Sequence, residues 1–219
     1  MPCSSKPKPA GLRSVAVIAG LAERTGERCG GPVILAGLVV GLGVVQLASG
    51  PLGLTSRFSL EMLILLVLQL VGPMLVALFA LTLSLPRWIT HFSRTDRGLQ
   101  LEAVAAAALV GAVLQLLFLA SAICGGILGT PRSDLVGELR ELLGGLLWVD
   151  LGRACLRSSV FLGAVCGWSQ WRSQRAQQLG RDPYRLVSDQ LAEGFVVLLS
   201  LKLIWISLIE PLHLITTPQ

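Results

Sequence analysis

Three long stretches without any charged residue constrain the fold of this chain more than any other feature. They cover residues 29–56, 62–86 and 103–131. Each exceeds the roughly 20 residues that an α-helix needs to cross about 30 Å of hydrocarbon. They are continuous in Leu, Val and Ala and lack the alternation of barrel strands. We therefore expect three membrane-spanning helices, because a helix satisfies its own backbone hydrogen bonds in lipid.

The composition agrees with a membrane protein. Hydrophobic residues make up 53% of the 219 residues, and charged residues only 14%, where a soluble domain has about 25%. A soluble domain could not cover its surface with so few charges. Composition thus excludes an intrinsically disordered chain and an ordinary cytosolic enzyme.

Two further apolar stretches, about 144–167 and about 194–216, contain charges and could instead be interfacial helices. These charges are Asp150, Arg153 and Arg157 in the first stretch, and Lys202 and Glu210 in the second. If both stretches cross, twelve Lys and Arg residues outside the spans lie on the side of the N-terminus and three on the other. If the first does not cross, the division is eight against nine. Basic residues favour the cytoplasmic side, so we predict five spans and a cytosolic N-terminus.

The predicted architecture is an all-α, multi-pass membrane bundle that follows a cytosolic tail, residues 1–31. The membrane domain covers residues 32–216, with spans at about 32–54, 61–85, 102–129, 144–167 and 194–216. Residues 14–22 also resemble the apolar core of a signal peptide, but an uncleaved tail is the preferred interpretation. A plasma membrane or endomembrane location is favoured, and the sequence does not choose between them.

The charged residues of the last two predicted spans form one candidate site. Asp150, Arg153 and Arg157 are spaced to share one helix face, and Asp150 can pair with Arg153. A bare charge at the bilayer centre costs about 2.5–3.5 kcal/mol, so this face should meet the bundle, a partner or water. Matching the depths of the two spans predicts an Arg153–Glu210 contact, with Lys202 nearer the cytoplasm. The face is either an internal or partner-binding charge site, which we favour, or part of an ion or proton path.

Small residues predict where helices pack closely, because helices in lipid gain little from burying more apolar surface. The candidates are Gly37, Gly41, Ala107, Gly111, Gly125, Gly129, Gly163 and Gly167. The sequence does not reveal whether the contacting helices belong to this chain or to another.

Two short features have both a functional and a structural interpretation. Tyr184 and Val187 fit a tyrosine-based sorting signal in a cytosolic loop, although the preceding residues also form an ordinary turn. Cys29, at the edge of the first apolar stretch, is a candidate for palmitoylation or simply a buried thiol.

No recognised catalytic pattern accompanies these features. The sequence lacks HExxH, Walker A and GxSxG motifs, and its five cysteines form no CxxC. We therefore expect no metal, no cofactor and no enzymatic activity. The expected partners are the lipid bilayer, anionic headgroups near the cytosolic loops, and other membrane proteins or further copies of the chain, with no nucleic acid.

The function that fits best is that of an accessory subunit, organiser or trafficking adaptor acting through helix contacts. A small ion channel or transporter using the charged residues of the last two spans is the alternative. An intramembrane enzyme of unrecognised chemistry is the third.

Overall fold

The computed structural model of the chain describes residues 10–49, 71–92, 101–128, 148–179 and 183–208. Within these ranges it contains five helices and no strand, which confirms the all-α prediction. The helices are α1 (Ala10–Ser49), α3 (Gly72–Phe92), α4 (Leu101–Leu128), α6 (Trp148–Gln178) and α7 (Pro183–Leu208).

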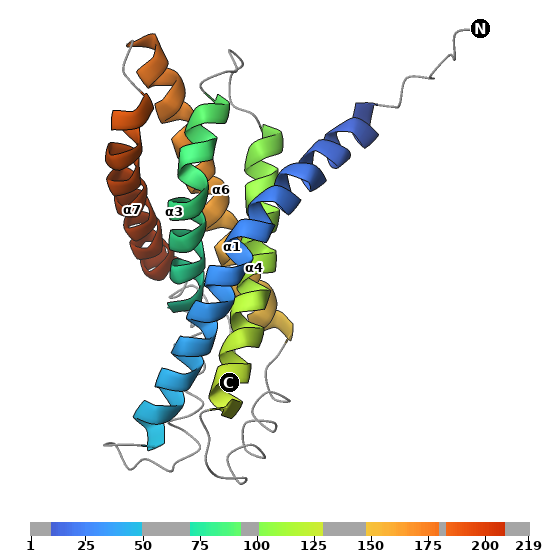
Figure 1. Cartoon of the computed structure of the whole chain (residues 1–219), viewed down its shortest axis with the longest axis vertical. Helices are drawn as coiled ribbons and strands as arrows, with labels where there is room; N and C mark the ends of the chain where they lie inside the picture. Colours follow the sequence, from blue (N-terminus) through green and yellow to red (C-terminus); the bar gives the residue numbers. More distant parts are fainter. Residues whose placement is uncertain (1–9, 50–70, 93–100, 129–147, 180–182, 209–219) are drawn as a thin grey trace, which may run out of the picture.

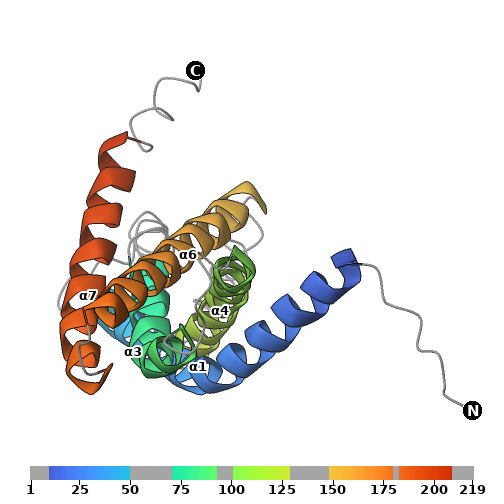
Figure 2. The same cartoon turned by 90° about the horizontal axis from the view of Figure 1, so that it is seen from above.

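The helices form an elongated bundle in which α3 and α6 occupy the middle (Figures 1 and 2). Helices α1 and α4 lie on one side of this pair and α7 lies on the other. The starts of α4 and α7 and the ends of α3 and α6 lie at one end of the bundle, called the upper end here (Figure 1). Successive described helices therefore run up and down through the bundle.

Two apolar clusters hold these layers together. One joins α1, α3, α4 and α6 around the fully buried side chains of Leu114 and Phe118. The other joins α3, α6 and α7 around Leu81, Phe161 and Leu198. Because α3 and α6 contribute to both clusters, they couple the two sides of the bundle.

Four of the described helices are long and apolar enough to cross a membrane. The candidate spans are Ile18–Leu47, Gly72–Ile89, Leu101–Leu128 and Val187–Ser207. Helix α4 is apolar on all sides, and large side chains such as Leu109 and Val113 are about half exposed. A soluble monomer rarely leaves so much apolar surface uncovered, so the bundle fits an integral membrane protein.

Helix α6 differs from the sequence prediction, which counted its segment as a fifth span at 144–167. The segment is helical, but by length and composition it is not among the four candidate spans of the described chain. The reason is its polar content, which comprises Arg157, Ser158 and Gln170 on its inner side and the charged pair Asp150 and Arg153. The inner groups pack against other helices, while outward positions such as Leu156 and Val160 are apolar.

The observed helix boundaries also shift several predicted ones. Helix α1 is continuous across the predicted boundary between residues 31 and 32, and its candidate span begins at Ile18. It continues through Pro32, which cannot donate the helical hydrogen bond that the carbonyl of residue 28 would accept. Helix α4 agrees closely with the predicted span at 102–129, whereas α7 starts well before residue 194.

The closest helix contact joins α1 to α4, which cross obliquely (Figure 1). A Cβ atom on Gly37 would lie 2.6 Å from the carbonyl oxygen of Phe118, and one on Gly41 would overlap the carbonyl of Ala122. From the other side, a Cβ atom on Gly125 would overlap the backbone of Leu38. Glycine on both helices thus permits backbone-to-backbone contact.

The other predicted small residues differ in their surroundings. A Cβ atom on Gly111 would come within 2.7 Å of the carbonyl oxygen of Ser158 on α6, whereas Gly163 and Gly167 would meet only ordinary contacts. Ala107 is buried in the first apolar cluster, and Gly129 lies outside the described residues. The sequence analysis missed Gly194, where a Cβ atom would lie 2.9 Å from Leu81.

We predict opposite effects for alanine at two neighbouring glycines of α1. Gly41→Ala should destabilise the bundle by about 1–3 kcal/mol, because its new methyl group overlaps backbone that cannot move aside. Gly43→Ala meets no atom within 4 Å and should stabilise the helix by about 0.5–1 kcal/mol. Thermal unfolding of the purified chain in detergent measures both, and equal shifts would contradict the α1–α4 contact.

Candidate functional site

The structure divides the predicted charged face of α6 into an exposed part and a buried part. The Arg153 side chain is 50% exposed and pairs with Asp150 at 3.6 Å, within the same helix. Arg157 is only 6% exposed and faces the interior. Glu210 lies outside the described residues, and so does the predicted Arg153–Glu210 contact.

The buried part lies where α6 meets α7. The guanidinium carbon of Arg157 is 5.3 Å from the ring centre of Trp205, a cation–π arrangement. The same indole ring stands edge-on to Phe161, with ring centres 6.1 Å apart. Lys202, which is 5% exposed, is three residues before Trp205 on α7 and therefore lies on the same side of that helix. The sequence-predicted residues Arg157 and Lys202 thus both face the bundle interior.

A second polar group lies toward the upper end of the same α6–α7 contact. Arg172 donates two hydrogen bonds to the carboxylate of Glu193, at 2.8 and 2.6 Å. Nearby, the amide of Gln190 donates to the hydroxyl of Ser173 at 3.3 Å. This paired geometry fixes α7 against α6 more specifically than apolar contact alone.

Apolar side chains separate these two polar groups. Phe161 and Val165 lie between them on α6, and Leu198 lies between them on α7, all at most 1% exposed. Together with Leu81 and Leu85 of α3 they form the second apolar cluster. Along the described part of the α6–α7 contact, the polar residues therefore form no continuous line.

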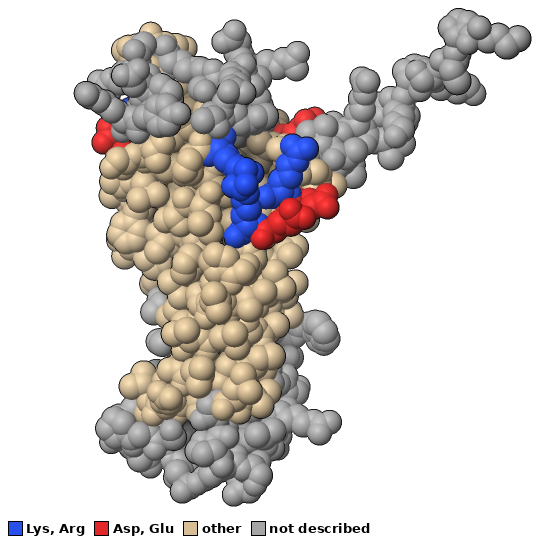
Figure 3. Space-filling view, in the orientation of Figure 1, with Lys and Arg blue, Asp and Glu red and all other residues tan. Residues whose placement is uncertain are grey.

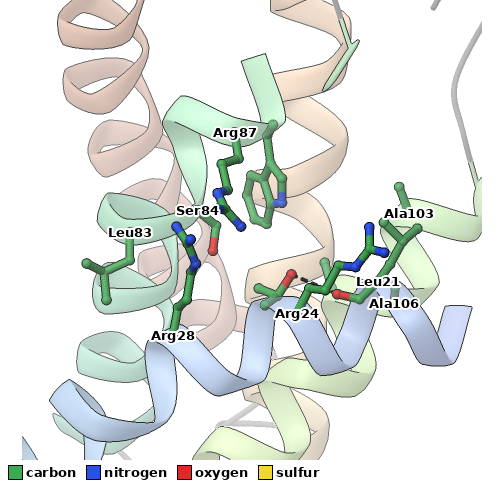
Figure 4. Close-up of a pocket in the computed structure, with 11 residues that line it drawn as sticks. Leu21, Arg24, Arg28, Leu83, Ser84, Arg87, Ala103 and Ala106 are labelled. Atoms are coloured by element: carbon green, nitrogen blue, oxygen red, sulfur yellow. Dashed lines mark hydrogen bonds between the residues drawn. The ribbon is translucent and has the colours of Figure 1, made fainter. Parts of the chain in front are cut away.

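A pocket of about 170 Å³ opens on the other side of the bundle, between α1, α3 and α4. Three arginines line it: Arg24 and Arg28 from α1, and Arg87 from α3. Figure 4 shows the side chains of Arg28 and Arg87 converging beside Ser84, while Arg24 extends toward α4. None of the eleven lining residues is acidic.

This pocket lies at the border between the charged and apolar surface of the bundle. On the face drawn in Figure 3, basic and acidic side chains lie beside one another toward the upper end, and the described surface below them is uncharged. All three arginines are exposed, and Trp88 of the pocket is partly buried. An indole ring at such a border is typical of the membrane–water interface.

The sequence analysis did not identify the arginine pocket. Its signal was present, since Arg24 and Arg28 are one helical turn apart and Arg87-Trp88 ends an apolar stretch. The sequence alone does not show that α1 and α3 pack side by side.

Cys29, the predicted lipidation candidate, is fully buried. Its sulfur lies 3.6 Å from the hydroxyl oxygen of Ser84, inside the α1–α3 contact. This packed position leaves no space for an acyl chain and favours the structural interpretation of the thiol.

The predicted sorting residues lie in the first turns of α7, which begins at Pro183. Val187 packs against the second apolar cluster. The side chain of Tyr184 lies outside the part that the structure describes. Because this segment is helical and Val187 packs against the cluster, its structural role is better supported than a role as a sorting signal.

The chain matches no protein-family model and no curated protein sequence. In the described ranges no three His, Cys, Asp or Glu side chains are grouped closely enough to hold a metal ion. The interpretation of function therefore depends on the contacts and charges described above.

We predict that the buried cation–π contact between Arg157 and Trp205 contributes more to stability than the exposed one between Arg175 and Trp171. Trp205→Leu should cost about 2 kcal/mol or more, because it removes the ring beside the buried guanidinium of Arg157. The indole nitrogen of Trp205 has no hydrogen-bond partner among the described residues, so only ring contacts are lost.

Trp171→Leu is the matched control, because Trp171 is 44% exposed and its ring centre lies 5.2 Å from the guanidinium of Arg175. It should cost about 0.5–1 kcal/mol in the same thermal unfolding experiment. A larger loss of stability in Trp171→Leu than in Trp205→Leu would show that the Trp205 ring does not stabilise the buried Arg157.

Proposed function

We propose that the chain is a non-enzymatic, multi-pass membrane protein that binds other membrane proteins through its helices, as an accessory subunit or organiser. The observation that carries the proposal is the Asp150–Arg153 pair on the outer side of α6. The outward position of Arg153 lies among the exposed apolar residues Val149 and Leu156.

An outward charged pair is costly against lipid. Polar groups inside a membrane are stabilised by facing other helices or water, and interhelical polar contacts are worth about 0.6–2 kcal/mol. With half of Arg153 uncovered, the chain's own described helices do not complete this contact. A partner helix with a polar or acidic side chain at this depth would complete it.

The described α6–α7 contact supports binding over conduction. An ion or proton path needs polar groups in succession across the membrane. Here the cluster around Phe161 and Leu198 lies between Arg157 and the upper polar group. A trafficking adaptor is likewise less well supported, because Val187 packs into the bundle.

We further propose that the upper end of the bundle faces the cytosol. Most of the described arginines lie toward that end, including Arg24, Arg87 and Arg172, whereas Arg153 lies toward the opposite end of α6. Basic residues favour the cytoplasmic side of a membrane. The N-terminus would then be cytosolic, as the loop charges also predict.

Crosslinking and purification in mild detergent, followed by mass spectrometry, tests the proposed function. We expect a stoichiometric membrane-protein partner whose recovery falls at least about fivefold with Asp150→Asn/Arg153→Gln, as loss of about 1 kcal/mol implies. Arg175→Gln is the control, since it removes an exposed charge at the other end of α6 and should leave recovery unchanged. Purification of the chain alone, or a partner insensitive to the double variant, would contradict the proposal.

Reconstitution into liposomes tests the alternative of a channel or transporter. The buried cations Arg157 and Lys202 are the residues through which it would act. An ion flux that is abolished by Lys202→Met and retained by Arg175→Gln would favour this alternative over partner binding. We expect no flux above that of empty liposomes.

A further inference from the structure

We infer that the first part of α1, residues 10–28, is an interfacial helix that lies on the lipid headgroup layer, and that a bend at residues 30–32 directs it there. Only the rest of α1 crosses the membrane. Partner binding at α6 plays no part in this inference, which concerns the opposite side of the bundle.

The outward side of α1 changes from charged to apolar over two helical turns. The side chains before the change are all exposed and are Glu23, Arg24, Glu27 and Arg28. Ile34 and Leu35 lie about two turns further along the same side of the helix and are 38% and 64% exposed. Figure 3 likewise shows acidic and basic side chains beside one another, with an uncharged described surface below them. The border between headgroups and hydrocarbon therefore crosses α1 between residues 28 and 34.

The length of the helix places the border at the same point. The candidate span Ile18–Leu47 has 30 residues, which extend about 45 Å and exceed the roughly 30 Å of hydrocarbon. Residues 29–47 contain no charged residue, and they alone extend about 28 Å. Tilting could fit more of the helix into the membrane, but it would draw the four charges into hydrocarbon. Residues 29–47 thus suffice to cross, and residues 10–28 lie outside the hydrocarbon.

The regularity of the helix is interrupted at this border. Pro32 cannot donate a hydrogen bond to the carbonyl of residue 28, and it follows Gly30 and Gly31. A Cβ atom on either glycine would meet no atom within 4 Å, so close packing does not require glycine here, unlike at Gly37. Proline and glycine are common at helix bends. Helix α1 changes direction along its length, and its first part leans away from the bundle, over the surrounding lipid (Figures 1 and 2).

The composition of this first part fits the headgroup layer. Residues 14–22 contain no charged residue and include valine, isoleucine and leucine, yet they extend only about 14 Å and cannot cross. The exposed charges that follow need water or headgroups. A short helix with both kinds of group is stable at the membrane surface, where its apolar side chains reach about 5–10 Å into the headgroup–acyl boundary.

Spin-label accessibility of the full-length chain in phosphatidylcholine liposomes tests this placement. The label is attached at Ala19→Cys, an exposed position in the first part of α1. Val39→Cys, 67% exposed, is the control in hydrocarbon, and Leu179→Cys, 64% exposed and beyond the arginines at the end of α6, is the control in water. The buried Cys29 and Cys166 stay in place, and serine replaces the other native cysteines, Cys3, Cys124 and Cys155.

We expect the label at Ala19→Cys to lie within about 5–10 Å of the headgroup–acyl boundary. Oxygen should reach it more than it reaches Leu179→Cys, and a water-soluble nickel complex should reach it more than it reaches Val39→Cys. Accessibility equal to that at Leu179→Cys would overturn the inference, because the first part of α1 would then stand in water. Low accessibility to both reagents would also overturn it, because the helix would then be covered by protein.

Variants at the bend test why the helix lies there. Gly30→Ala/Gly31→Ala/Pro32→Ala restores a regular helix, and the methyl groups at the two glycines meet no other atom. The straightened helix should rise from the surface, so the label at Ala19→Cys should approach the accessibility of Leu179→Cys. Gly43→Ala, which also meets no atom but lies within the crossing part, is the matched control and should not change the label's depth.

An unchanged depth in the triple variant, or an equal change in Gly43→Ala, would overturn the bend as the cause of this placement. Size-exclusion elution of each variant before labelling shows whether it is folded. Glu23→Cys, at another exposed position of the first part, replaces Ala19→Cys if that variant is not folded.

Discussion

The close crossing of α1 and α4 determines much of the arrangement around it. Glycine at positions 37 and 41 allows α1 to lie directly on the backbone of α4 near Phe118 and Ala122. The two helices cross obliquely, so their separation changes along their length (Figure 1). Toward the upper end, Arg24 and Arg28 of α1 and the small residues Ala103 and Ala106 of α4 line the pocket between the two helices. The tight contact and the pocket are thus two consequences of one crossing.

The second determining constraint is the cost of polar groups in an apolar solvent. Helix α6 contains more polar side chains than a helix facing lipid on all sides could hold, and the bundle surrounds them with α3, α4 and α7. Arg157 is held against an indole ring, and Arg172 is paired with Glu193. Arg153 and Arg175 are exposed instead, and Arg153 lies among the exposed apolar residues Val149 and Leu156. The exposed Arg153 side chain is the reason for proposing a partner helix.

The sequence predicts the parts of this fold that depend on periodicity and composition. Charge-free stretches gave the all-α bundle and the bounds of α4 closely, because a membrane imposes length and polarity on each crossing helix. The glycines of α1 were candidates for helix contact because close approach in lipid requires small side chains. Side-chain direction at Cys29 was not predictable, because it depends on α1 being helical well before residue 32 and packing against α3 beside Ser84. The pocket could not be predicted for the same reason, since Arg28 and Arg87 meet only after α1 and α3 pack.

The two polar features that remain accessible differ in what can satisfy them. The Asp150–Arg153 pair is nearly neutral as a unit and lies near the start of α6, so a polar helix suits it better than a free ion. The arginine pocket lies at the border of the apolar surface, where Arg87 already has a partner and acidic side chains lie beside the other basic ones.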